Sequence, residues 1–388
     1  MSELDRRAAS DRAEDDPRRA SPWGVLMLGA IVVLIVTGHW ALVVAVLGLA
    51  LLIFVHELGH FAAAKAFHMR VERFYIGFPP AVLRRRWGET EYGVGAIPLG
   101  GFCRISGMTP DEELPPEVVP RAYYSKPVWQ RNIAIAAGPA MNILAALVIM
   151  FVFIEAGGMQ QPTLKIAQVV KGSPAAAAGL RVGDRIVGAD GHRFTSWQQT
   201  TSFFESQAPG STVALTVRTP AGKLRTVPVT LAARPGAPHE GYVGVGPATV
   251  ASHPAPWRAA GLAVRQTAGL VGAIFTGLWM VASGKINPAG PEGAAGPVGI
   301  ISVSQTAVRQ SWYPILLAFL SVNLGIINLL PFLPFDGGHL FFNTVESVRG
   351  RRVDARVLER AIAIGVVLLV TLFILLTYND LHRIFHFG

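Results

Sequence analysis

Two histidines and a glutamate interrupt an otherwise apolar stretch of the chain, "LLIFVHELGHFAAAK" (51–65). On a helix, His56 and His60 project from one face about one turn apart, which is the spacing that two imidazoles need to bind one tetrahedral zinc ion. Glu57 lies about 100° further round the helix, where it can reach a water molecule at the metal without being a ligand. The stretch therefore predicts a catalytic zinc site with Glu57 as the general base.

The apolar surroundings favour this interpretation over the alternative, a helix of a soluble protein that carries two unrelated histidines. An ionisable side chain at mid-bilayer costs about 2.5–3.5 kcal/mol on insertion scales, and a metal ion that binds both imidazoles offsets this cost. If a membrane span begins near Ala41, His56 lies about 22 Å along it, roughly 8 Å from the far edge of a hydrocarbon core about 30 Å thick. We therefore expect an intramembrane site near the end of that span.

The third protein ligand must come from another part of the chain, because a catalytic zinc commonly has three protein ligands and one water molecule. No further histidine follows at the metzincin spacing, and Glu72 and Glu89 lie in a basic loop where a solvated surface role is typical. The best candidate is Asp336, which ends the apolar run in "NLGIINLLPFLPFDGGH" (323–339). Two alternatives remain: Asp336 only marks the end of a helix before a Gly-Gly turn, or His339 is the ligand instead.

The composition of the whole chain agrees with a membrane location. Hydrophobic residues make up 51% and charged residues only 15%, against about 25% charged residues in an average soluble protein. The 388 residues leave room for several spans and one soluble domain of about 100 residues. The formal charge of +9 is spread between apolar segments, so we expect no nucleic-acid partner. Cys103 is the single cysteine, which excludes an internal disulfide and a cysteine-based zinc cluster.

The distribution of basic residues predicts the topology. Ten Lys or Arg lie in 65–131, five in 349–360 and five in 1–20, so the positive-inside rule places these three segments in the cytoplasm and 157–312 outside. A signal peptide is the alternative for the first apolar segment, but no small-x-small cleavage site follows it. The predicted membrane segments are 23–40, 41–67, 132–156, 313–335 and 357–378.

Residues 261–283 could form another span, but the position of Asp336 argues against it. A span here would place the end of 313–335 on the membrane face opposite His56 and His60. The sequence also carries Trp257, Arg258, Arg265 and Trp279, which suit a helix that lies in the membrane interface. We therefore expect an interfacial amphipathic helix and a linker within 254–312.

Three motifs occur together and in order: "HELGH" (56–60), "GPAMN" (138–142) and "NLLPFLPFDGG" (328–338). Together they resemble the site-2 proteases, which are intramembrane zinc metalloproteases. Two further stretches are similar to the bacterial regulator-of-sigma-E-protease branch: "GETEYGVGAIPLGGFCRISGMTPDEE" (88–113) and "GSPAAAAGLRVGDRIVGADG" (172–191), the second of which resembles part of a PDZ domain. The resemblance covers roughly residues 45–385.

This resemblance implies an α-helical polytopic membrane protein with an inserted small β-rich PDZ domain. It implies a bacterial inner-membrane location with the PDZ domain on the periplasmic side, and cleavage of the transmembrane helix of a single-span protein, usually an anti-sigma factor already cut outside. The site residues that it implies are His56, His60 and Asp336 as ligands of Zn²⁺, Glu57 as the catalytic base, and Asn323 and Asn328 as substrate contacts. For either asparagine, the alternative is a hydrogen bond between helices.

The chain then divides into five predicted parts. These are a disordered cytoplasmic tail (1–20), an N-terminal membrane region with the HExxH helix and a cytoplasmic β-rich loop (21–156), a PDZ domain (162–247), the interfacial helix and linker (254–312), and a C-terminal membrane region with the third zinc ligand (313–388). The PDZ domain either excludes substrates with a bulky external part or serves as a docking module. Within the β-rich loop, the extended segment "GVGAIPLGG" (93–101) is a candidate edge for strand addition by an unwound substrate.

Three features depart from the family pattern. An extra apolar segment precedes the metal-binding helix, "GFPP" (77–80) stands where the family usually has Gly-Phe-Gly-Pro, and one PDZ domain is present rather than two. The alternative function is a membrane scaffold or chaperone whose zinc site is structural or vestigial. Glu57 discriminates between them, since a structural zinc needs no base beside its ligands. A metal transporter would carry polar groups through several spans, whereas here they cluster at one depth.

Overall fold

The computed structural model describes residues 22–108, 112–157, 159–234, 236–286 and 295–386, so the tail predicted at 1–20 lies outside the described residues. The chain forms two compact units. One consists of Met1–Phe153 with Ala260–Gly388, and the other of Ile154–Ala259. We call them the membrane unit and the β-rich unit.

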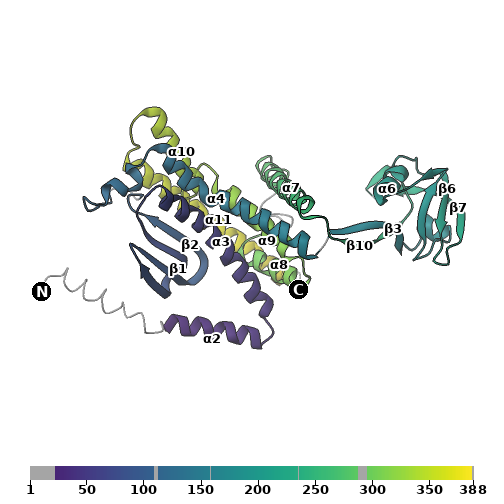
Figure 1. Cartoon of the computed structure of the whole chain (residues 1–388), viewed down its shortest axis with the longest axis horizontal. Helices are drawn as coiled ribbons and strands as arrows, with labels where there is room; N and C mark the ends of the chain where they lie inside the picture. The colour runs from purple at the N-terminus through teal and green to yellow at the C-terminus, as the bar shows by residue number, and fades with distance from the viewer. Residues whose placement is uncertain (1–21, 109–111, 158, 235, 287–294, 387–388) are drawn as a thin grey trace. The chain divides into compact units, whose positions relative to one another are not determined.

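Eight helices make up most of the described part of the membrane unit (Figure 1). They are α2 (Pro22–Val36), α3 (Trp40–Ala66), α4 (Val128–Gly157), α7 (Pro256–Ala282), α8 (Pro297–Arg309), α9 (Tyr313–Asn328), α10 (Asp336–Arg349) and α11 (Ala355–His386). Within the described residues, α3, α4, α7 and α11 are long and apolar enough to cross a membrane, while α2 and α9 are shorter apolar helices. Only 6% of the most apolar 18-residue stretch of α11 is buried by the rest of the protein. Most of its side chains are therefore available for contact with lipid.

One helix is shorter than the predicted segment. α9 ends at Asn328 rather than running to residue 335, because Pro331 and Pro334 cannot continue a helix, and the chain becomes helical again only at Asp336. The segment predicted to lie in the interface forms α7, Pro256–Ala282, whose length and composition would also allow a span. The extra N-terminal segment forms α2, which packs against α3 and β1.

α3 and α9 run in the same direction. Tyr313, at the start of α9, donates a hydrogen bond of 2.9 Å to the backbone oxygen of Ala45, near the start of α3. Beyond the other end of α9, Asp336 lies 3.1 Å from His56, in the second half of α3. α9 therefore runs alongside α3, and the chain that follows α9 places the first turn of α10 next to His56.

α4 packs closely on both of these helices through glycines. A Cβ atom at Gly59 of α3 would lie 2.3 Å from the backbone oxygen of Ala137 in α4. A Cβ atom at Gly325 of α9 would lie 3.1 Å from the backbone oxygen of Pro139 in the same turn of α4. Such small residues let membrane helices approach closely, so α4 joins α3 and α9 at the level of the site.

The predicted β-rich loop forms a long curled hairpin beside α3 (Figure 1). Its strands are β1 (Val71–Trp87) and β2 (Thr90–Ile105), and the short helices η1 (Val119–Arg121) and η2 (Tyr123–Ser125) follow it. Tyr75 is paired with both Phe102 and Gly93, so the hairpin folds back on itself. Residues 101–105 thus lie on one side of 71–76, and residues 91–94 lie on the other.

The unusual "GFPP" segment falls where the pairing of this hairpin shifts. The register passes from Phe78 paired with Ile97 to Ala81 paired with Gly95, and Pro79 and Pro80 between them are exposed. A proline in such a break interrupts no regular ladder of hydrogen bonds. The departure from the family pattern is thus accommodated at a bend of the strand.

An ion cluster ties the turn of the hairpin to the end of α3. Glu89 accepts two hydrogen bonds of 2.7 Å from the Arg121 guanidinium and one of 2.6 Å from Lys65, in the last turn of α3. The Arg121 hydrogen bonds, with the charge of Lys65, lower the pKa of Glu89 to about 2. The carboxylate therefore stays charged at physiological pH and holds the hairpin against the metal-binding helix.

The β-rich unit is a small antiparallel domain. Its strands are β3 (Met159–Val169), β4 (Arg185–Ala189), β5 (His192–Arg193), β6 (Thr212–Arg218), β7 (Leu224–Thr230), β8 (Ala232–Arg234), β9 (Ala237–Tyr242) and β10 (Val245–Ser252), with helices α5 (Pro174–Ala177) and α6 (Trp197–Glu205). The main sheet has the order β10-β3-β4-β6-β7, with β5 beside β4.

Alternation along the strands builds the core of this unit. In β6, Val213, Leu215 and Val217 are buried while the residues between them face outward, as expected for a strand with one covered face. The sheet extends from Met159 to Ser252, slightly beyond the predicted limits. The expected architecture, an α-helical polytopic membrane protein with an inserted small β-rich domain, is confirmed.

Candidate metal centre

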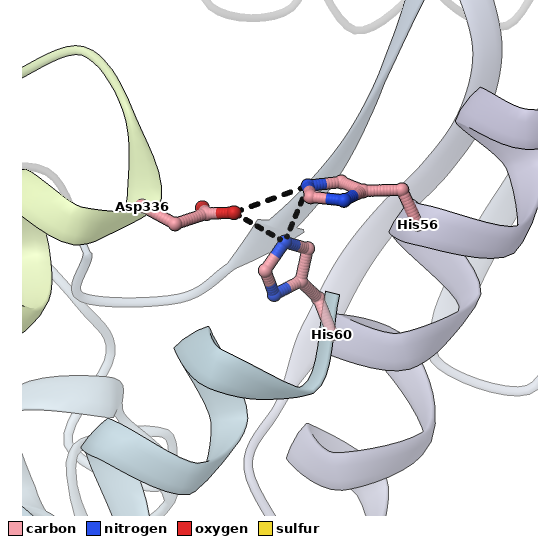
Figure 2. Close-up of side chains that lie close together, drawn as sticks. All are labelled: His56, His60 and Asp336. Carbon is pink, nitrogen blue, oxygen red and sulfur yellow. Dashed lines mark hydrogen bonds and ion pairs between the residues drawn. The ribbon is translucent and has the colours of Figure 1, made fainter. Parts of the chain in front are cut away.

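His56, His60 and Asp336 converge on one point. Nε2 of His56 lies 3.2 Å from Nε2 of His60, and Oδ2 of Asp336 lies 3.1 Å from the first and 3.3 Å from the second. Figure 2 shows the two imidazoles on successive turns of α3 and the carboxylate arriving from the start of α10. Both histidines are buried, at 6% and 7% exposure.

These distances fit a zinc ion. In a tetrahedral site with ligands about 2.0–2.1 Å from the metal, neighbouring donor atoms lie about 3.3 Å apart. The three observed separations, from 3.1 to 3.3 Å, match this value. Oδ2 of Asp336 is also buried and has no partner in hydrogen-bond geometry, which a cation at this point would supply. Two imidazoles and one carboxylate are a typical ligand set for a catalytic zinc.

α4 orients both imidazoles through their other ring nitrogen. Nδ1 of His60 lies 2.9 Å from the backbone oxygen of Ala134, and Nδ1 of His56 lies 3.3 Å from the side-chain amide of Asn142. A Cβ atom at Gly138, between these two positions, would lie 2.3 Å from Nε2 of His60. Ala134, Gly138 and Asn142 are spaced four residues apart, so one face of α4 supports the metal-binding face of α3.

Asp336 opens a helix, unlike the alternative in which it marks a helix end before a Gly-Gly turn. It is the first residue of α10, and Gly337 and Gly338 are buried within the helix. Cβ atoms on these glycines would lie 2.2 Å from the backbone oxygen of Leu329 and 2.5 Å from the backbone nitrogen of Leu333. The glycine pair therefore lets the preceding segment pack against the first turn. His339, the other candidate ligand, is half-buried and outside the cluster.

α10 is anchored to α4 by a buried ion pair. Arg131 of α4 donates two hydrogen bonds of 3.0 Å to Glu346 and one of 3.3 Å to Asn343. Such bidentate pairs fix geometry as well as charge, and loss of one partner from a buried pair costs about 3–5 kcal/mol. The pair thus holds the helix that begins with Asp336.

Glu57 faces a cavity that also contains the metal cluster. The cavity has a volume of about 390 Å³ and is lined by Ile53, His56, Glu57, His60, Gly100, Gly101, Phe102, Cys103, Ile105, Met108, Ile135, Leu324, Asn328, Pro334 and Asp336. A Cβ atom at Gly101 would lie 3.1 Å from Cγ of Glu57, so β2 passes directly beside the carboxylate. The base, the ligands and one strand of the hairpin therefore share one space.

The two asparagines expected to contact the substrate have different positions. Asn328 lines the cavity, and its Nδ2 donates a hydrogen bond of 3.0 Å to the backbone oxygen of Leu324. Asn323 lies five residues earlier, about 140° round the helix, and is half-buried outside the cavity lining. Asn142 and Arg131 support the site although no sequence pattern assigned either residue a role. Asn142 stands in a motif that was recognised, and its spacing of four from Gly138 is the signal that places it toward α3.

Comparison with known proteins agrees with this geometry. Residues 44–372 match Peptidase family M50. The chain is 30% identical over 384 residues to the metalloprotease MmpA of Caulobacter vibrioides, which covers 86% of this chain and 94% of the relative. It is 32% identical over 359 residues to the zinc metalloprotease Rip1 of Mycobacterium tuberculosis, which covers 81% of this chain and 88% of the relative.

Two solved structures of PDZ domains are similar to part of the chain. The PDZ domain of an SdrC-like protein from Listeria monocytogenes is 22% identical and covers 23% of this chain and 90% of that chain, with a TM-score of 0.20. Its counterpart from Listeria innocua is 24% identical and covers 24% of this chain and 99% of that chain, with a TM-score of 0.21. The family match covers most of the chain, the relatives are similar over most of their length, and the cluster of ligands suits zinc. The chain therefore belongs to Peptidase family M50, the membrane-embedded site-2 zinc metalloproteases.

Proposed function

We propose that this zinc metalloprotease cuts a peptide bond inside the transmembrane segment of a single-span membrane protein whose external part has already been removed. An anti-sigma factor is the expected substrate, which would make this the second cut of regulated intramembrane proteolysis. The observation that carries the proposal is the place of the site: His56, Glu57 and His60 lie in the second half of α3, a helix of 27 residues whose most apolar stretch of 18 residues has a mean hydropathy of 2.5. A bond cut there is a bond in the membrane.

The chemistry divides between the metal and the residues around it. Zinc held by His56, His60 and Asp336 supplies Lewis acidity, which makes water nucleophilic near neutral pH and polarises a carbonyl group. The carboxylate of Glu57 accepts the proton of the attacking water and then passes it to the leaving amine. The metal ligands and Glu57 line one cavity, which keeps the reacting groups together.

The substrate must unwind before it can be cut, because a helical peptide bond is sheltered by its own hydrogen bonds. Its freed backbone groups then need partners, since lipid offers none. Residues 100–103 of β2 line the cavity, and the register pairs 101–105 with β1 on one side. The other edge of this segment is the proposed site of strand addition, and Asn328 is the side chain placed to bind a freed amide.

The directions of the helices support a periplasmic β-rich unit. α3 and α9 run the same way, so the chain between α4 and α9 must cross the bilayer an even number of times. α8 has 13 residues, or about 20 Å at 1.5 Å per residue, which is too short for a core about 30 Å thick. If α7 alone crossed the bilayer, the number of crossings between α4 and α9 would be odd. We therefore place α7 in the membrane interface and residues 157–312 on the periplasmic side of the inner membrane.

This topology predicts a labelling pattern in intact cells. In a Cys103→Ala background, a thiol reagent that cannot cross membranes should label a cysteine introduced at Ser211, in the β-rich unit, and should not label one at Ser347, in α10. Labelling of both sites in permeabilised cells is the control for reactivity. Equal labelling of the two sites in intact cells would contradict the assignment.

The β-rich unit carries a cavity of its own, which favours a docking role over simple exclusion of bulky substrates. The cavity has a volume of about 220 Å³ and lies between α6 and the segment 241–245, with Trp197, Phe204 and Tyr242 among its lining residues. Removal of this unit should therefore leave the chemistry intact and loosen the choice of substrate, because it contributes no ligand to the metal cluster.

A comparison of membrane-protein fragments tests the proposed function. Cells that produce the parent protein and cells that produce the Glu57→Gln variant are compared by mass spectrometry of their membrane fraction. We expect membrane-anchored stubs of at least one single-span protein to accumulate only with the variant. Identical fragment sets, with both proteins present in equal amounts, would contradict proteolysis of such substrates.

A further inference from the structure

The side chain of Asn142 lies at the junction of three helices, directly behind the metal cluster. The residue is fully buried, and its Nδ2 lies 3.3 Å from Nδ1 of His56. The other polar atom of the amide, Oδ1, is also buried and has no hydrogen-bond partner. A buried, unpaired amide oxygen beside a metal-binding imidazole calls for an explanation, because buried polar atoms are nearly always paired.

The bonding of His56 indicates which amide atom should face it. Nε2 of His56 points to His60 and Asp336, so with zinc bound Nε2 would give its lone pair to the metal and the proton of the neutral ring would reside on Nδ1. Nδ1–H is a donor and needs an acceptor. An amide fits the same space in two orientations related by half a turn, and only the orientation that brings Oδ1 to Nδ1 supplies one.

The second histidine of the site shows the same arrangement with no ambiguity. Nδ1 of His60 lies 2.9 Å from the backbone oxygen of Ala134, which can only accept a hydrogen bond. Ala134 and Asn142 lie on the same helix, two turns apart, so with the amide of Asn142 turned by half a turn α4 would present one oxygen to each imidazole. The two ligands are then held by equivalent bonds.

We propose that Asn142 is a positioning residue for the zinc site, whose Oδ1 accepts a hydrogen bond from Nδ1–H of His56 and holds that ring with Nε2 toward the metal. Its own place is fixed by α9: Oγ of Ser321 donates a hydrogen bond of 2.8 Å to the backbone oxygen of Asn142. A Cβ atom at Gly325 would lie 3.4 Å from Cβ of Asn142. The residue therefore couples His56 to the helix that leads to Asp336.

Two substitutions of Asn142 distinguish a role as hydrogen-bond acceptor from a role as hydrogen-bond donor and from a role in packing. Asn142→Leu keeps the size and removes the acceptor, whereas Asn142→Asp keeps an acceptor and removes the N–H donors. Zinc affinity of the full-length protein in detergent is measured by competition with a chelator. Asn142→Leu should weaken zinc binding by about 10–100-fold, the usual effect of losing such a partner, and Asn142→Asp should bind zinc at least as tightly as the parent protein.

Thr267→Val is the matched control, because it also removes a buried polar group that has no hydrogen-bond partner among the described residues, in α7 and outside the metal cluster. It should bind zinc as the parent does. Parent-like affinity in Asn142→Leu would show that the amide has no role at the metal. Equal weakening in Asn142→Leu and Asn142→Asp would show that it acts by donation or packing, and either result overturns the proposal.

A measurement on the parent protein keeps the test decisive if Asn142→Leu fails to fold. In zinc-loaded protein with isotope-labelled histidine, nuclear magnetic resonance reports which ring nitrogen carries the proton. The signal of His56 is identified by its loss in His56→Ala. We expect a proton on Nδ1 of His56, and a ring with the proton on Nε2 and the metal on Nδ1 would overturn the proposal.

Discussion

The Glu57→Gln variant is expected to keep its zinc and lose nearly all of its proteolytic activity. The amide has the shape of the carboxylate and leaves His56, His60 and Asp336 in place, but it cannot accept the proton of the attacking water. General-base catalysis contributes about 10²–10⁴-fold, so cleavage should fall at least that far. The measurement is the rate of cleavage of a single-span substrate whose external domain has been removed, with matched amounts of parent and variant protein.

Glu72→Gln is the matched control, since it makes the same carboxylate-to-amide change outside the site. Glu72 accepts a hydrogen bond of 2.8 Å from Ser106 and pairs with Arg104 at 3.2 Å, and it does not line the cavity of Glu57. This variant should cleave at the parent rate. If Glu57→Gln also cleaves at the parent rate, the proposed mechanism is wrong.

The second large effect is on the metal itself. Purified parent protein should contain about one equivalent of zinc, and the His56→Ala, His60→Ala double variant should contain almost none, because a single carboxylate does not hold zinc tightly. Zinc content is measured by elemental analysis after dialysis. His339→Ala should retain its zinc, since His339 lies outside the cluster. Full occupancy in the double variant would show that the metal is bound elsewhere.

The sequence was most informative where one helix carries the chemistry. The spacing of His56 and His60 is sufficient to place both imidazoles on one face, because the geometry of a helix depends only on local dihedral angles. Asp336 lies far from the two histidines in the sequence. It could be assigned to the same site only because the predicted topology puts all three residues at the same depth in the membrane. The close approach of the three donor atoms supports that argument.

What sequence reasoning missed depends on contacts between distant segments. The spacing from Gly138 places Asn142 on one face of α4, but it does not show that the amide lies behind His56, because that contact needs α3 and α4 packed through Gly59. Likewise, the glycines after Asp336 are typical of a turn, yet they lie in the first turn of α10, where residues 329–333 pack against them. Asn323 was grouped with Asn328 by resemblance, although five residues turn the two side chains to different faces of α9.

The curled hairpin shows the same limit. The sequence indicated extended structure in 93–101, but the pairing of Tyr75 with both Phe102 and Gly93 involves three segments of the chain. A local pattern cannot specify such a register. The edge that faces the cavity therefore became visible only in the folded protein.

The position of the cut bond tests the central claim most directly. Parent protein and a single-span substrate without its external domain are reconstituted in lipid vesicles, and the products are sequenced by mass spectrometry. In the proposed topology, a span that begins near Ala41 places His56 about 22 Å along it, roughly 8 Å from the cytoplasmic edge of the hydrocarbon core. We therefore expect the cut within the apolar segment of the substrate, toward its cytoplasmic end. Cuts confined to residues outside the apolar segment would contradict an intramembrane protease, and binding of the substrate by both parent and Glu57→Gln without any cut would favour the scaffold.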